Sequence, residues 1–131
     1  MAGSLIIADA FPALGKDGRY HPHLAELRDY QASGVYAIVS PRGLVLYVGE
    51  SHSGRLYDTI TRHFRAWKVD RFTDAQGRRF GGTTYDRNKV RVIYLVCNAG
   101  EAQERQYAEI QRLQPRDNIN DGSSTAVELP V

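Results

Sequence analysis

Residues 34–51 read GVYAIVSPRGLVLYVGES, which is two apolar runs separated by a short polar stretch. The runs Val35–Val39 and Leu44–Val48 have the length and the β-branched content of strands. Between them, residues 40–43 (SPRG) suit a type I turn, because proline is second and glycine fourth. This stretch therefore predicts a β-hairpin, and each arm carries one tyrosine two residues away from a glycine.

The relative placement of Tyr36 and Tyr47 depends on the length of the hairpin loop. A loop of two or four residues places them directly opposite each other, whereas a loop of three staggers them to opposite faces unless a bulge intervenes. Tyrosine is common in half-buried strands, so the pair has an ordinary structural interpretation. The alternative is that two phenols beside bare glycine backbone form part of a site.

The chain after the hairpin predicts further regular elements. Beyond a glycine-rich break at 49–54, apolar side chains recur at the spacing of an amphipathic helix. These are Leu56, Ile60, Phe64 and Trp67. Residues 89–97 (KVRVIYLVC) predict a third strand, and residues 101–113 predict a second helix that ends before Pro115. The order strand, strand, helix, strand, helix is that of a small α+β domain.

We expect one core and three parts of the chain. Residues 1–33 are too short for a core of their own, so they are predicted to pack as an arm on the domain, with a short helix near residues 24–30. Residues 34–120 form the predicted domain, with a long loop at 68–89 that shows no sustained periodicity. Residues 121–131 are predicted to be a frayed tail.

The composition excludes several classes of protein. The 131 residues are 42% hydrophobic and 24% charged, which is typical of globular proteins. No run approaches the length of a transmembrane helix, and residues 1–18 lack the features of a signal peptide, so we expect a cytoplasmic protein without a membrane partner. Cys97 is the single cysteine and no HExxH motif occurs, which argues against a disulfide and a zinc hydrolase.

Positive charge is concentrated in residues 62–91. The net charge of the chain is +2, but this segment has nine Lys or Arg against three Asp, which is +6 and leaves −4 for the rest. The nine are Arg62, Arg65, Lys68, Arg71, Arg78, Arg79, Arg87, Lys89 and Arg91. Aromatic residues are interleaved with them, as on surfaces that follow phosphates and stack bases. We expect the first eight of these cations to contact nucleic acid, although a solvated loop is an equally simple interpretation.

The order of these motifs resembles that of the GIY-YIG nuclease superfamily. The resemblance extends from about Gly34 to Asn120 and includes the GVY and YVG triplets, an arginine that opens the next helix, and a tail of Pro-x-x-Asn after the last helix. It implies a three-stranded antiparallel sheet flanked by helices that cleaves DNA with one divalent ion, Mg²⁺ or Mn²⁺. Such cleavage needs an activated water and neutralisation of charge on the phosphate.

The resemblance also implies roles for individual residues. Tyr36 and Tyr47 match the motif tyrosines, of which one would orient or deprotonate the attacking water and the other would support it. Arg55 matches the arginine that clamps the scissile phosphate. Family members often have a catalytic histidine or tyrosine one turn after this arginine, where this chain has Thr59, so His63, two turns after Arg55, is the candidate for that role. Arg62 is a second candidate for phosphate contact. Asn118 matches the tail asparagine that helps to close the site.

The metal ligand is where the chain departs most from the family. Counting back nine residues from Pro115 reaches Gln106 rather than a glutamate. Glu104 is the predicted ligand and Glu109 is an alternative, whereas a neutral Gln106 would bind a hard cation weakly. Glu50 is a second departure, because some family members have lysine there; it could recruit metal or cap the following helix.

Two functions are therefore expected, in order of preference. The first is a metal-dependent DNA endonuclease with a tyrosine, arginine and glutamate site. The second is a nucleic-acid-binding module of the same fold that has lost cleavage through the change at Gln106.

Overall fold

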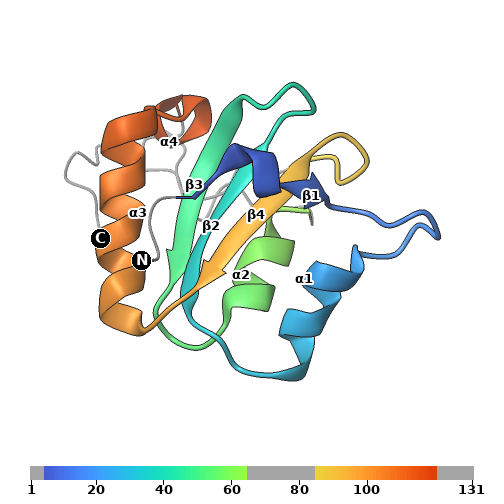
Figure 1. Ribbon diagram of the computed structural model, residues 1–131, viewed down its shortest axis with the longest axis horizontal. Helices are drawn as coiled ribbons and strands as arrows, with labels where there is room; N and C mark the ends of the chain where they lie inside the picture. Colours follow the sequence, from blue (N-terminus) through green and yellow to red (C-terminus); the bar gives the residue numbers. More distant parts are fainter. Residues whose placement is uncertain (1–4, 65–84, 121–131) are drawn as a thin grey trace, which may run out of the picture.

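The computed structural model describes residues 5–64 and 85–120, and Figure 1 shows how their helices and strands are arranged. In chain order the elements are the 3-10 helix η1 (Ile7–Asp9), β1 (Phe11–Pro12), α1 (Pro22–Glu26), the 3-10 helix η2 (Leu27–Asp29), β2 (Gly34–Val39), β3 (Val45–Ser51), α2 (Leu56–Arg62), β4 (Arg91–Val96), α3 (Ala99–Leu113) and α4 (Arg116–Asn120). The predicted α+β class is confirmed.

The four strands form one antiparallel sheet in the order β1-β4-β2-β3. The predicted sheet of three strands is thus one strand short, because β1 pairs with the outer edge of β4, Phe11 opposite Val92 and Pro12 opposite Arg91. A two-residue strand has no recognisable periodicity in the sequence. Proline tolerates this place because an edge strand does not need its missing amide hydrogen for a ladder bond.

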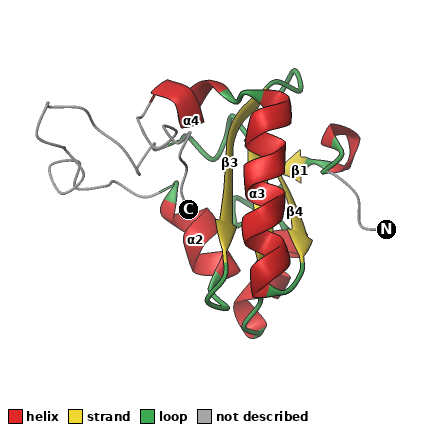
Figure 2. Ribbon diagram, turned by 90° about the vertical axis from the view of Figure 1, so that its left-hand side faces the viewer, coloured by secondary structure: helices red, strands yellow, loops and turns green. Residues whose placement is uncertain are grey.

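Helices cover both faces of the sheet. Figure 1 shows the sheet between α3 on one side and α1 and α2 on the other, and Figure 2 views it from the side of α3. Alternate residues of β2 enter two apolar clusters: Val35, Ala37 and Val39 pack with Ile110 of α3, and Tyr36 and Ile38 pack with Leu56 and Ile60 of α2. All six residues of β2 are buried, which is expected for a central strand with helices on both faces.

Residues 5–33 contribute to the core on the side of α2. Leu24 of α1 and Leu27 of η2 are buried in the same cluster as Leu56 and Ile60. The expected helix near residues 24–30 is shorter, because α1 begins at Pro22 and continues as the 3-10 helix η2. His21 caps α1, since its ring nitrogen accepts a bond from the amide of His23.

Helix ends follow the local chemistry of the sequence. α3 begins two residues before the predicted Glu101, because the side chain of Asn98 accepts a bond from the Glu101 amide and so caps the helix. Its last residue is followed by Gln114 in the left-handed conformation, immediately before Pro115. α2 ends at Arg62, so the predicted extension to Trp67 lies partly outside the described residues, as do most of the loop at 68–89 and the tail at 121–131.

Among the helices within residues 5–64 and 85–120, none has the length and apolar character that crossing a membrane requires.

Candidate active site

The two motif tyrosines lie on one face of the sheet because of a bulge in β3. Tyr36 is opposite Gly49 and Ile38 is opposite Tyr47, but Val39 is opposite Val45, so Leu46 is an extra residue in the ladder. Leu46 and Tyr47 consequently face the same side, where both pack against the cluster that contains Tyr36. The ring centroids of Tyr36 and Tyr47 are 6.3 Å apart. The bulge resolves the question that loop length left open.

The two motif glycines have separate packing reasons. A Cβ atom at Gly49 would lie 2.4 Å from the hydroxyl oxygen of Tyr36, so the ring of Tyr36 occupies the space that a side chain would need. A Cβ atom at Gly34 would lie 2.2 Å from the carbonyl oxygen of Leu95 on β4. Glycine is required at one position to seat a tyrosine and at the other to let two strands approach.

His63, at the end of α2, joins the two tyrosines into one cluster. The hydroxyl of Tyr36 lies 2.6 Å from Nε2 of His63, and the His63 ring centroid is 4.7 Å from that of Tyr47. The carbonyl of His63 accepts a bond of 2.7 Å from the amide of Tyr85, whose ring lies 5.9 Å from the imidazole. The predicted helix α2 is therefore followed by a C-cap histidine on the face of the sheet where Tyr36 and Tyr47 lie.

Burial determines the protonation state of Tyr36. Its side chain is 1% exposed, and this desolvation, followed by the neighbouring Tyr47, raises the pKa of Tyr36 well above its ordinary value. The phenol therefore keeps its proton at neutral pH and shares a hydrogen bond with Nε2 of His63. Tyr36 is suited to hold His63 in one orientation, and it is not suited to act as a base.

Tyr47 differs from Tyr36 in its access to solvent. Its side chain is half-buried, whereas Tyr36 and His63 are both buried. Of the two motif tyrosines, Tyr47 is thus the one that can meet a substrate directly. Two residues that the sequence left interchangeable therefore occupy different positions in the site.

A polar hollow of about 310 Å³ lies at the end of β3 and along one side of α2. Its lining comprises Glu50, Ser51, His52, Ser53, Arg55, Thr59 and Arg62. Arg62, one of the lining residues, immediately precedes His63 of the tyrosine cluster along the chain. Arg55 is exposed and lies 3.8 Å from Asp58, so it can leave this weak ion pair for an anion.

Glu50 is the carboxylate of this hollow. Its side chain is only 9% exposed, and its two oxygens lie 3.2 and 3.1 Å from Nδ1 of His52, which is itself largely exposed. Gln103 at the start of α3 approaches the same ring nitrogen at 3.4 Å. The sequence placed Glu50 beside the motif, but the orientation of its carboxylate toward His52 follows from the fold, and its position opposite Val35 puts it on the face of the sheet that α3 covers.

The predicted ligand Glu104 does not line the hollow. It is an exposed residue of α3, the helix that covers the face of the sheet opposite to Tyr36. The alternative Glu109 is buried, receives a bond from the Leu5 amide and pairs with Arg112 at 2.5 Å, so its charge is already compensated. Gln106 is half-buried. Within residues 5–64 and 85–120, no group of three or more His, Cys, Asp or Glu side chains is placed to hold a metal ion.

Asn118 completes the outer edge of β3. Its Oδ1 accepts a 2.8 Å bond from the amide of Val48, and its Nδ2 donates a 3.0 Å bond to the carbonyl of the same residue. β3 is an edge strand, so these two backbone groups have no neighbouring strand to pair with. The asparagine amide substitutes for that strand and so connects α4 to β3.

The contact between Tyr85 and Asp117, beside this cluster, could not be predicted from the sequence. The hydroxyl of Tyr85 donates a 2.6 Å bond to Asp117, and Arg116 binds the same carboxylate through two nitrogens at 2.7 and 2.9 Å. Burial and, after it, the bond to Asp117 raise the pKa of Tyr85. Tyr85 was only one of several aromatics in the basic segment, and its separation of 32 residues from Asp117 hides the pairing from any local pattern.

Of the eight cations predicted to contact nucleic acid, three lie among the residues that the structure describes. Arg62 lines the hollow, and Arg87 and Lys89 are exposed before β4, where the guanidinium of Arg87 lies 5.3 Å from the ring centroid of Tyr20. Arg65, Lys68, Arg71, Arg78 and Arg79 lie outside the described residues.

Comparisons with protein-family models, with curated proteins and with solved structures found no match to this chain.

Proposed function

We propose that this protein is a divalent-metal-dependent DNA endonuclease that hydrolyses phosphodiester bonds at the hollow between Glu50 and Arg62. The observation that carries the proposal is the joining of two parts: a cluster of Tyr36, Tyr47 and His63, and beside it a hollow with two arginines and one shielded carboxylate. Phosphodiester hydrolysis needs an oriented water and compensation of negative charge, and these two parts supply one each.

Arg55 and Arg62 are the proposed phosphate contacts. Both arginines line the hollow, and arginine presents paired N–H donors that match the oxygens of a phosphate. Arg55 would exchange its 3.8 Å contact with Asp58 for the substrate. Because that exposed pair contributes little to stability, the exchange costs little.

Glu50 would hold the divalent ion, in place of the predicted Glu104. Mg²⁺ is commonly bound by one or two carboxylates together with substrate phosphates and several waters, so one shielded glutamate beside a bound phosphate fits this ion. When bound, the ion would supply charge neutralisation and a more acidic water. His52 is a further donor within reach of the same site. Mn²⁺ is also compatible with this set of nitrogen and oxygen donors.

Tyr47 is the proposed residue that orients the attacking water. It is the half-buried phenol of the cluster, while Tyr36 holds His63 and His63 packs against the ring of Tyr47. Tyr36 is thus a positioning residue in this proposal. DNA is the proposed partner, the ion is the proposed cofactor, and the cytoplasm is the proposed compartment.

A nucleic-acid-binding module without cleavage is the second candidate. Two observations favour it: Gln106 stands where the motif count expects a carboxylate, and the described part of the chain has no cluster of three metal-ligating side chains. Such a module would keep the arginines and would bind DNA in a salt-dependent way without an ion site.

Nicking of supercoiled plasmid with Mg²⁺ or Mn²⁺ tests the proposal, with EDTA as the control for the ion. We expect Tyr47→Phe and Glu50→Gln each to lower the rate about a hundredfold or more, as for the loss of one group that acts on the transition state. Tyr107→Phe, an exposed change on α3, and Glu104→Gln should leave it unchanged.

Two other outcomes would change the assignment. Loss of nicking in Glu104→Gln with retention in Glu50→Gln would make Glu104 the ligand. Salt-dependent DNA binding without any nicking would favour the binding module.

A further inference from the structure

A second hollow, larger than the first, lies on the other side of Arg55. It has a volume of about 690 Å³, and its residues come from η2, from the segment between η2 and β2, from the loop before α2 and from the first turn of α2. Its polar and aromatic lining includes Asp29, Tyr30, Gln31, Arg55, Tyr57 and Asp58. Ser53 and Arg55 line both hollows, so the two hollows are neighbours that meet at this arginine.

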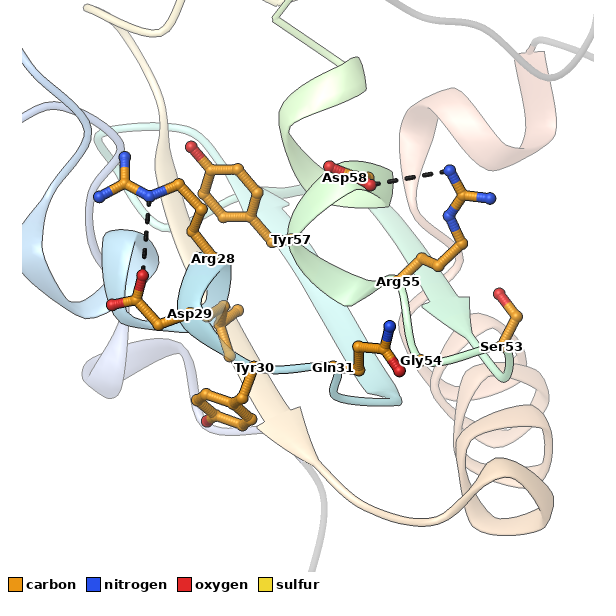
Figure 3. Close-up of a pocket in the computed structure, with 10 residues that line it drawn as sticks. Arg28, Asp29, Tyr30, Gln31, Ser53, Gly54, Arg55, Tyr57 and Asp58 are labelled. Carbon is orange, nitrogen blue, oxygen red and sulfur yellow. Dashed lines mark ion pairs between the residues drawn. The ribbon is translucent and has the colours of Figure 1, made fainter.

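The chemistry of this second hollow differs from that of the first. Two tyrosines, Tyr30 and Tyr57, line it. Figure 3 shows Tyr57 beside Arg28 at one end and Arg55 at the other end. Its volume is within the range of pockets that bind small organic groups. The formal charge of its lining is balanced, because Arg28 pairs with Asp29 and Arg55 pairs with Asp58.

We propose that the second hollow binds one unpaired nucleobase of the DNA strand whose phosphate is held by Arg55; this inference rests on the proposed function. An aromatic lining with a balanced charge suits a flat, uncharged base better than a phosphate. The amide of Gln31 and the carboxylates of Asp29 and Asp58 can pair with the donors and acceptors on the edge of a base.

The base must be unpaired to enter. In a duplex, the faces of a base are covered by its neighbours and its pairing edge is occupied, so a base reaches a side pocket only from a single strand or after leaving the stack. The phosphate in the first hollow and the base in the second would then lie on either side of Arg55. The site would consequently prefer single-stranded or locally opened DNA over a closed duplex.

Fluorescence of 2-aminopurine tests this inference. A set of single-stranded oligonucleotides, each with 2-aminopurine at one position, is bound in EDTA so that no cleavage occurs. Stacking on tyrosine quenches this base, so we expect quenching at one position. Tyr30→Ala and Tyr57→Leu should each abolish the quenching and weaken binding roughly tenfold. Tyr107→Ala is the matched control, because Tyr107 is 51% exposed and Tyr30 is 54% exposed, but Tyr107 lies on α3.

The outcomes separate this inference from the proposed function. Salt-dependent binding without quenching at any position, or equal quenching in the corresponding closed duplex, would overturn the base pocket and leave the nuclease proposal standing. Absence of oligonucleotide binding in the wild-type protein would overturn both. Tyr57 packs partly against the core, so leucine keeps most of its apolar volume, and Tyr30→Ala tests the hollow without any change in the core.

Discussion

Replacing Gly49 by alanine would test how the YVG triplet seats the buried tyrosine. The new Cβ atom would lie 2.4, 2.5 and 2.8 Å from the hydroxyl oxygen, Cζ and Cε1 of Tyr36, distances that force the ring to move. Gly49 does not have a positive φ, so alanine adds no backbone strain there. A loss of stability in this variant therefore measures the contact between position 49 and Tyr36.

Two effects determine the expected magnitude. Overpacking in a closed core costs about 1 to 3 kcal/mol. A displaced Tyr36 also loses its 2.6 Å bond to His63, and leaving a buried polar atom without its bond costs about 1 to 3 kcal/mol. We expect Gly49→Ala to lower the free energy of unfolding by the sum of these effects, about 2 to 6 kcal/mol.

Urea denaturation followed by circular dichroism is the assay, and it allows two controls. Gly100→Ala should be neutral or stabilising, because the nearest atom to a Cβ there is 3.6 Å away and alanine is favoured over glycine in a helix. In the double variant Gly49→Ala/Tyr36→Leu, the atoms that clash are absent, so its cost should be less than the sum of the two single costs. Wild-type stability in Gly49→Ala, or additive costs in the double variant, would refute the reasoning.

Three further predictions concern the edge of the sheet, the buried phenols and the arginines. Asn118→Ala should cost about 2 to 4 kcal/mol and speed hydrogen exchange of the Val48 amide, because both backbone groups of Val48 lose their partner; a cost no larger than that of the exposed helix cap Asn98→Ala would contradict this. Stability should fall above about pH 10, by about 1.4 kcal/mol per pH unit for each of Tyr36 and Tyr85, because burial raises the pKa of both phenols in the folded state and the unfolded chain releases their protons first. Urea titrations at pH 9 to 11.5 would measure this slope, and Tyr85→Phe should reduce it by roughly half. Arg62→Gln should weaken DNA binding and lower the slope of log affinity against log salt by about one, whereas Arg42→Gln, at the far hairpin turn, should change neither.

Local sequence was sufficient to specify most of the helices and strands of this protein. The alternation of apolar residues, the SPRG turn and the helical spacing after Gly54 predicted the hairpin and the helix after it. In the structure, the amide of Gly43 donates to the carbonyl of Ser40 as the predicted turn requires, and Gly43 has a φ of 94° that favours glycine. These features depend on neighbours within a few residues, so a short window of sequence carries them.

The pairing of side chains in the site came from the packing of the whole chain. The bulge at Leu46 placed Tyr47 on the face of Tyr36, and a one-residue difference in register would have sent it to the side of α3. Pairing of Tyr85 with Asp117, and the different locations of Glu50 and Glu104, depend on how distant segments pack around the sheet. Sequence periodicity indicates which residues are buried. It does not indicate which buried residues become neighbours, because that depends on how all the elements pack together in the tertiary structure.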